Sequence, residues 1–331
     1  MKKKKIQILK ATLFFIIVGL VIYVFWNQFP PIINEIKTTN ISTLILIAIL
    51  GLMYQFFDGL SLRTIAKSLD SQVSIIDAWG CSLYSAFYRV ITFGAATYIS
   101  IIYFFKRLGL EATKGFSIST LNYMAQRIAV VITAIIFYLI NYSFMQKYFL
   151  KYQNFLLLGI LITSIIVIVL ILICVSENFH KLVMMIFKLD KKERFNDLKI
   201  KTEDSLSLIR NSTKDLLLDK VLLIKIIILN ILKLFCWYLI PCIIFKGKYN
   251  YTLFDYVSIT ALAVSLIGVI PAPGAMGSTE FVFGMLFSQL MNAHSAMSGV
   301  FLYRFANFII PTVFGAVVAI VMKFGKKTIS D

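Results

Sequence analysis

The stretch VIPAPGAMGSTEF, Val269 to Phe281, interrupts an apolar region near the C-terminus. Its two prolines lack the amide hydrogens that a helix needs, and Gly274 and Gly277 permit tight turning and close approach. Non-helical backbone at membrane depth is tolerated only where it is buried in protein or lines a wet cavity. Glu280 follows immediately. The stretch therefore predicts a break between two half-helices, with a carboxylate beside it.

The composition indicates a membrane protein. The chain has 331 residues, of which 59% are hydrophobic and only 15% are charged, and its mean hydropathy is +0.85. Soluble domains carry about 25% charged residues. Several apolar runs reach the roughly 20 residues that cross about 30 Å of hydrocarbon. We therefore expect an all-α polytopic membrane protein.

The same survey argues against most enzyme classes. The net charge of +17 lies mainly in short segments between apolar runs, which fits membrane topology and anionic lipid headgroups rather than nucleic acid. Four cysteines without a CxxC pair and two histidines give little support for a metal site. GxSxG, HExxH, P-loop and Rossmann motifs are absent from the sequence. We expect no catalytic residues, no cofactor and no ATP-driven pump.

Hydropathy divides the chain into six full spans, two broken apolar regions and one polar segment. The polar segment, 177–220, carries ten Lys or Arg and eight Asp or Glu, and its stretch HKLVMMIFKL has an apolar centre with basic ends, which predicts a place in the membrane interface. The broken regions are 76–105 and 254–291. The full spans are approximately 8–26, 41–57, 116–140, 155–175, 221–245 and 296–322.

The positive-inside rule predicts the topology. Four basic clusters, at the N-terminus, after the first broken region, in the polar segment and at the C-terminus, can all be cytoplasmic only if neither broken region crosses the bilayer. Each broken region is then a re-entrant hairpin. The first enters from the cytoplasm and the second from outside, and both termini are cytoplasmic.

The two hairpins resemble each other. FGAATYI, residues 93–99, resembles PGAMGSTE, residues 273–280, and each is followed by a helix carrying an arginine near its middle. Because these arginine helices run in opposite directions, the pattern is that of an inverted repeat, a common transporter architecture. Chance similarity between glycine- and alanine-rich segments is the alternative. The predicted organisation is a single integral membrane domain, 1–331, with repeat units of about 41–141 and 221–322 on either side of a cytoplasmic segment, 177–220.

The arginines of the two repeats need partners. A charge at the bilayer centre costs at least about 2.5–3.5 kcal/mol, so Arg127 and Arg304 should face the protein interior. For Arg304 the candidate is Glu280, and for Arg127 the candidates are Asp58 and Asp77. Such pairs have two interpretations: they fasten each hairpin to its neighbour, or they form a polar groove that binds a lipid headgroup.

The groove interpretation has a chemical basis. The planar guanidinium fork of arginine donates two parallel hydrogen bonds to phosphate, and carboxylates bind a cationic headgroup. A third arginine, Arg89, lies within the first hairpin. A half-helix starting near Ser278 would add free amides and a positive dipole end, which also favour an anion.

These residues resemble a known family. PAPGAMGSTEFVFGMLF resembles the P-x-PGG-x-G-x-x-E signature of the membrane domain of lysylphosphatidylglycerol synthase/flippase proteins. YQFFDGL, with Asp58, resembles an early YD-like element, and FGAATYISIIYFFKRLGL resembles the glycine-rich first turn. The resemblance extends from about residue 8 to residue 322. Three positions depart from the pattern: Ala275 replaces a glycine, Thr92 replaces a proline, and Ile102 replaces an arginine of some members.

The resemblance implies a function. Larger members fuse this membrane domain to a cytosolic aminoacyltransferase that transfers lysine to phosphatidylglycerol, whereas this chain ends at Asp331. We therefore expect the lipid-translocating half, without phosphatidylglycerol lysyltransferase activity of its own. The expected substrate is an anionic or aminoacylated phospholipid or a glycolipid. The expected substrate-binding residues are Asp58, Arg127, Gly274, Gly277, Glu280 and Arg304.

Two other functions fit the same sequence. The chain is alternatively a membrane subunit that recruits a lipid-modifying enzyme or glycosyltransferase through residues 177–220. It is alternatively an ion-coupled transporter of a small solute, built on the same inverted repeat. A second copy of the chain is a further candidate partner.

Overall fold

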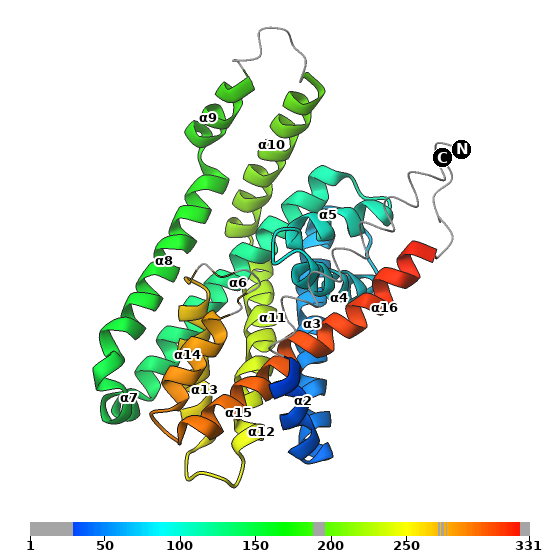
Figure 1. The fold of residues 1–331 in the computed structure, drawn as a ribbon. Helices are drawn as coiled ribbons and strands as arrows, with labels where there is room; N and C mark the ends of the chain where they lie inside the picture. The colour runs from blue at the N-terminus through cyan, green and yellow to red at the C-terminus, as the bar shows by residue number, and fades with distance from the viewer. Residues whose placement is uncertain (1–28, 188–195, 271, 273–274, 276, 325–331) are drawn as a thin grey trace.

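The computed structural model describes residues 29–187, 196–270, 272, 275 and 277–324 (Figure 1). It is 86% helical, and the described residues contain no strand, which confirms the predicted all-α class. The predicted span 8–26 lies outside the described residues, and so does Gly274 of the expected site.

Five helical stretches are long and apolar enough to cross a membrane, and they correspond to the other five predicted spans. The first, α3, continues past Phe57 to Ser68. The third, fourth and fifth each consist of consecutive helices. In order, the helices of these spans are α3 (Ile41–Ser68), α6 (Ala112–Ile140), α7 (Tyr142–Phe149) with η1 (Leu150–Tyr152) and α8 (Gln153–Val175), α11 (Lys220–Tyr238) with α12 (Ile240–Phe245), and α15 (Ala293–Arg304) with η3 (Phe305–Ile309) and α16 (Ile310–Phe324). A short helix, α2 (Phe29–Thr38), precedes them.

Both broken regions form helical hairpins made of shorter helices. The first consists of α4 (Ile75–Ile91) and α5 (Thr97–Arg107), and the second of α13 (Leu253–Ile267) and α14 (Ser278–Phe287). In Figure 1, α4 and α5 lie toward the end of the bundle from which α9 and α10 project, whereas α13 and α14 rise from the opposite end, beside α12. The two hairpins thus point their turns toward each other inside the bundle.

The first turn is closed by a side chain rather than by a proline. Phe93 and Gly94 have φ angles of 53° and 93°. The Thr92 hydroxyl donates to the Tyr88 carbonyl at 2.6 Å and accepts from the Ala96 amide at 2.9 Å. Thr92, the residue that replaces the proline of the related pattern, therefore stabilises the turn with two hydrogen bonds that proline cannot make.

The polar segment is mostly helical and partly integrated into the bundle. It forms α9 (Glu177–Phe187) and α10 (Asn196–Leu218), which run side by side (Figure 1). Arg210 of α10 pairs with Glu177 of α9. Ile209 and Leu216 of α10 are buried, since this helix packs against α6 and α8. The expected position of HKLVMMIFKL in a membrane interface stays a prediction.

The outer surface is apolar. Leu161, Ile165 and Leu172 of α8 keep 56%, 49% and 60% of their surface exposed. Comparable side chains of α3, α11 and α16 are also exposed. Contiguous apolar surface of this extent is costly in water and favourable in hydrocarbon. Together with the five long apolar helices, it makes this chain a multi-pass membrane protein.

Helices α3 and α4 approach closely at one glycine. A Cβ built on Gly59 would lie 2.7 Å from the Trp79 amide nitrogen and 2.8 Å from the Ala78 carbonyl oxygen, both backbone atoms. On α4, by contrast, the nearest atom to a Cβ on Gly80 would be one of the Phe104 ring, at 3.4 Å. Small residues at such crossings let helix backbones approach in membranes.

We therefore predict different outcomes for alanine at these two positions. Gly59→Ala should lower the free energy of unfolding by roughly 1–3 kcal/mol, because α3 and α4 must separate. Gly80→Ala, the matched control, should be neutral or slightly stabilising, since alanine favours the helix. Thermal unfolding in detergent measures both. Equal melting temperatures for the two variants would contradict the close crossing.

Candidate functional site

Arg304, the last residue of α15, holds the second hairpin. Its Nε and Nη2 donate to the two carboxylate oxygens of Glu280, at 2.8 Å and 3.0 Å. Glu280 lies in the first turn of α14, where the helix dipole favours a carboxylate. The Arg304 side chain is 7% exposed and that of Glu280 is 19% exposed. The predicted partnership of these two residues is confirmed, with bidentate geometry.

The same guanidinium also binds the broken backbone. Arg304 Nη2 donates to the Ala275 carbonyl, which further accepts from the Ser278 and Thr279 hydroxyls. Ala275 has a φ of 60°, a left-handed conformation that glycine adopts without cost. This explains why the related signature has a glycine at this position. Gly277, with a φ of 75°, precedes α14, which begins at Ser278 as predicted.

A π-helical turn follows Arg304. Residues Phe305–Ile309 form this turn between α15 and α16. Pro311 has no amide hydrogen to donate to the Asn307 carbonyl four residues earlier, and its ring crowds that carbonyl. Widening the helix by one residue relieves the conflict, and π-turns of this kind often occur at functional sites.

Arg127 does not bind either of its predicted carboxylates, so that expectation is wrong. Its guanidinium lies against the Tyr123 ring, with 4.9 Å from Cζ to the ring centroid. Its Nη1 occupies the space that a Cβ of Gly268 would need. Gly268 caps the C-terminus of α13, whose dipole attracts a cation. Asp77 instead accepts from the Ser74 hydroxyl at 2.6 Å, at the start of α4.

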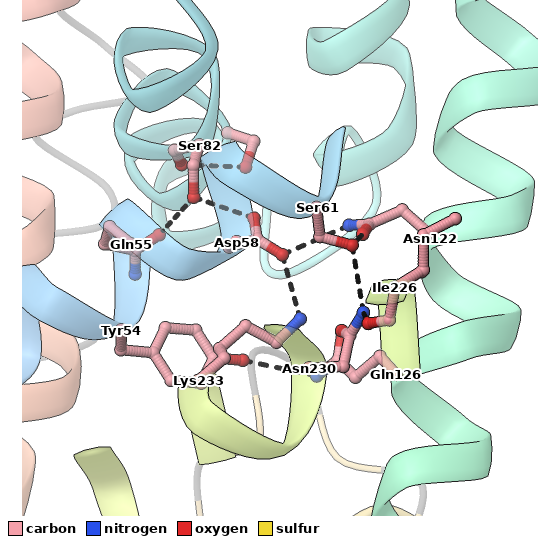
Figure 2. A network of polar contacts seen from close by, with 11 residues as sticks. Tyr54, Gln55, Asp58, Ser61, Ser82, Asn122, Gln126, Ile226, Asn230 and Lys233 are labelled. Atoms are coloured by element: carbon pink, nitrogen blue, oxygen red, sulfur yellow. Dashed lines mark hydrogen bonds and ion pairs between the residues drawn. The ribbon is translucent and has the colours of Figure 1, made fainter. Parts of the chain in front are cut away.

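Asp58 binds a different cation. Lys233 Nζ of α11 donates to Asp58 Oδ1 at 2.9 Å, and the Lys233 side chain is fully buried. Figure 2 shows this carboxylate between Ser82 of α4, Asn122 of α6 and Lys233 of α11. Asn122 Nδ2 donates to Asp58 Oδ1 at 3.1 Å, and the Ser82 hydroxyl donates to Oδ2 at 2.7 Å. One carboxylate of α3 thus joins three neighbouring helices.

The network continues beyond the ion pair. The Ser61 hydroxyl donates to Asn122 Oδ1 at 2.7 Å and accepts from Asn230 Nδ2 at 2.9 Å (Figure 2). On the other side, the Gln55 amide oxygen lies 2.7 Å from the Ser82 hydroxyl, while the buried amide nitrogen has no partner in the described part of the chain. Exchanging these two amide atoms would let Gln55 donate to Ser82, which then donates to Asp58.

Sequence reasoning missed Lys233. It lies within the apolar run VLLIKIIILNILKLFCWYLI, and an ionisable residue inside a span is by itself a sign of a buried partner. Asn230, one turn earlier, carried the same signal. Neither signal could name the partner, because Asp58 is 175 positions away in the chain.

Aromatic rings connect this network to the hairpin turns. Lys233 Nζ lies 5.5 Å from the Tyr54 ring centroid. The Tyr54 ring stacks on Trp237, with 3.8 Å between centroids and an interplanar angle of 5°. Trp237 is one turn after Lys233 on α11. Trp237 also lines a cavity.

A cavity of about 300 Å³ lies between the two hairpin turns. Phe93 and Gly94 of the first turn and Ala272 and Ala275 of the second line it. Residues of α4, α11, α13, α14, α15 and η3 complete the lining; those used below are Arg89, Trp237, Thr279, Arg304 and Asn307. The space is comparable to small-molecule sites in other proteins.

The lining contains polar atoms without partners. Trp237 Nε1 and Asn307 Oδ1 are buried and make no hydrogen bond to any described residue. Arg89 forms none of the ion pairs found among the described residues. Buried polar groups are normally satisfied, so unpaired polar atoms beside a cationic side chain indicate a site for a polar ligand.

The expected substrate-binding residues therefore differ in whether they line the cavity. Arg304 lines the cavity and holds Glu280, whereas Asp58 and Arg127 lie outside its lining. Gly277 shapes the second turn and is exposed. Arg89 and Trp237 belong to the lining although they were not among the expected binding residues.

The described residues hold no cluster of three His, Cys, Asp or Glu side chains suited to a metal ion. All four cysteines are free thiols. The described site offers cationic and neutral hydrogen-bond donors around a small cavity, where the turns of the two helical hairpins approach each other.

Comparison with protein families agrees with this geometry. The family model described as "Lysylphosphatidylglycerol synthase TM region" matches residues 7–315. The chain belongs to this family. The family description points to lipid handling, and the family resemblance inferred from the sequence is confirmed. A search of curated proteins finds no match.

The buried ion pair gives a second prediction. Lys233→Met should lower the free energy of unfolding by about 3–5 kcal/mol at neutral pH, because it leaves the Asp58 carboxylate without its cation. The loss should shrink at lower pH, where a protonated Asp58 needs no cation. Glu177→Gln, which breaks the exposed pair with Arg210, should cost at most about 1 kcal/mol. Chemical unfolding in detergent measures both variants, and equal losses would contradict the assignment.

Proposed function

We propose that this protein moves, or binds for transport, a lipid with an anionic phosphate-containing headgroup. The expected substrates are an anionic or aminoacylated phospholipid, or a glycolipid. The observation that carries the proposal is the cavity between the two hairpin turns, lined by Arg89 and Arg304. Membership of a family named for lysylphosphatidylglycerol handling supports a lipid ligand over a water-soluble one.

Phosphate suits the donors of the cavity. Arg89 is free to form two parallel hydrogen bonds to phosphate oxygens, since it enters no ion pair among the described residues. The Trp237 indole N–H adds a neutral donor that has no acceptor among the described residues. Arg304 contributes positive potential, although its guanidinium is occupied by Glu280 and Ala275. An incoming phosphate would compete with these two acceptors for Arg304.

The hairpin arrangement supports a path across the membrane. The turns approach each other from opposite ends of the bundle (Figure 1), and the cavity lies between them. Broken helices meeting near the midplane are typical of transporters that alternate access to two sides. Lipid tails would stay in the bilayer while the headgroup crosses. On this proposal the hairpins are re-entrant and related by an inverted repeat.

The transport prediction uses Arg89, because its removal breaks no ion pair found among the described residues. Arg89→Gln should slow the movement of fluorescent phosphatidylglycerol across reconstituted vesicles roughly tenfold or more, the loss expected for a hydrogen bond to a charged group. Glu280→Gln should also impair transport, because Arg304 then loses one partner in the turn. Arg210→Gln, on the projecting α10, is the control and should transport normally. If the wild-type protein moves no labelled lipid with any headgroup tested, the proposal fails.

The proposed setting is the bacterial cytoplasmic membrane, with both termini inside. Two loops test this orientation: the one between α3 and α4, containing Gln72, and the one between α12 and α13, containing Lys248. In a chain without native cysteines, an impermeant maleimide should label Lys248→Cys in intact cells and Gln72→Cys only after lysis. The reverse result would invert the topology, and labelling of both would reject it.

A further inference from the structure

The Asp58–Lys233 pair lies beside the cavity but is not part of its lining, and the function proposed above does not use it. It is the most deeply buried of the ion pairs among the described residues. The two residues join α3 to α11. Three further hydrogen bonds, donated by side chains of α4, α6 and α11, belong to the same network. A pair that only held α3 against α11 would need neither access to water nor a route to the cavity.

The first feature is unequal access to water. The Asp58 side chain keeps 14% of its surface exposed, whereas that of Lys233 is completely buried. A proton from water can therefore reach the carboxylate without displacing the ammonium group. The pair is electrically neutral, and a proton on Asp58 gives it a net charge of +1.

The second feature is a network that is satisfied in both protonation states. The Ser82 hydroxyl donates to the carboxylate and can turn to accept from a protonated acid. Asn122 continues to donate to Oδ1 in either state. Neither state leaves the Asp58 oxygens without partners, so the change costs little hydrogen bonding.

The third feature is a route to the cavity. Lys233 lies over the Tyr54 ring, Tyr54 stacks on Trp237, and Trp237 lines the cavity. Arg89, which also lines the cavity, acts electrostatically on both Lys233 and Tyr54. An anion beside Arg89 therefore changes the potential at the ion pair.

The surrounding charged and titratable groups determine the sign of this effect. Lys233 is the charged group that acts on Asp58, which in turn acts on Tyr54 of its own helix and on Cys81 of α4. From α6, the neighbouring polar groups are the uncharged Asn122 and Gln126. Beyond Tyr54 lie the phenols of Tyr238 and Tyr303. Only Lys233 and Arg89 among these are cations. A headgroup phosphate that shares either cation leaves Asp58 as a less compensated buried anion, which favours its protonation.

We propose that Asp58 is a proton-binding site, and that an anionic headgroup entering the cavity binds together with one proton on this carboxyl group. This proposal rests on the proposed function and adds that the ion coupled to lipid binding is a proton. The proton comes from water and bonds to Asp58, while Lys233 keeps its ammonium charge. By linkage, protons strengthen headgroup binding as much as the headgroup strengthens proton binding.

The test measures protons directly. Short-chain phosphatidylglycerol is added to the full-length protein in weakly buffered detergent, and a pH-sensitive dye reports proton uptake while calorimetry reports lipid binding. The wild-type protein should take up as much as about one proton per bound lipid, and its affinity should rise by at most about tenfold per unit fall in pH. Short-chain phosphatidylcholine, which has no net charge, should cause no uptake.

Variants test whether Asp58 binds the proton in a protein that still folds. Asp58→Asn should abolish uptake, and the double variant Asp58→Asn with Lys233→Gln, which leaves no buried charge unpaired, should also bind lipid without uptake. Glu177→Gln should behave as wild type. Lipid binding by the wild type without proton uptake, or unchanged uptake in the double variant, overturns the inference and leaves the proposed function standing. Absence of lipid binding in the wild type, despite a native melting transition, rejects both.

Discussion

The broken backbone of the second hairpin depends on one guanidinium group. Where α13 and α14 separate, carbonyl groups lose their helical partners inside an apolar bundle, and each unsatisfied group would cost several kcal/mol in such surroundings. Arg304 donates to the Ala275 carbonyl and, through two further bonds, to Glu280 of α14. The cation, the carboxylate and the strained turn satisfy one another. Arg304 and Ala275 of this arrangement also line the cavity between the hairpin turns.

A second polar centre connects the helices that surround the hairpins. Asp58 receives hydrogen bonds from α4, α6 and α11, and Ser61 extends the network to Asn230. In a membrane, apolar contacts between helices give little preference over lipid, so hydrogen bonds and small residues specify which helices meet. The glycine crossing of α3 and α4 beside this network fits that logic. The two polar centres are linked through Tyr54 and Trp237.

Prediction from the chain succeeded where the interacting groups are close in sequence. Glu280 and Arg304 lie on consecutive helices that flank one motif, so their pairing followed from the break itself. Prediction failed for Arg127, because the rotation of α6 directs its guanidinium to the C-terminus of α13 rather than to Asp58 or Asp77. The cation that Asp58 binds is on α11, and no spacing rule relates the two. Likewise Ala275 was noted as a departure, but only its φ angle explains the glycine of related sequences.

The sequence by itself determined that this protein is helical, that it crosses a membrane several times, where the two long apolar regions break, and which family it belongs to. Those properties follow from hydropathy, from proline and glycine, and from a local motif, all of which act over a few turns of helix. The tertiary structure decided which charge neutralises which, and where unpartnered polar atoms gather around a cavity. Those outcomes depend on helix rotation and on crossings between helices far apart in the chain, and local composition does not specify either.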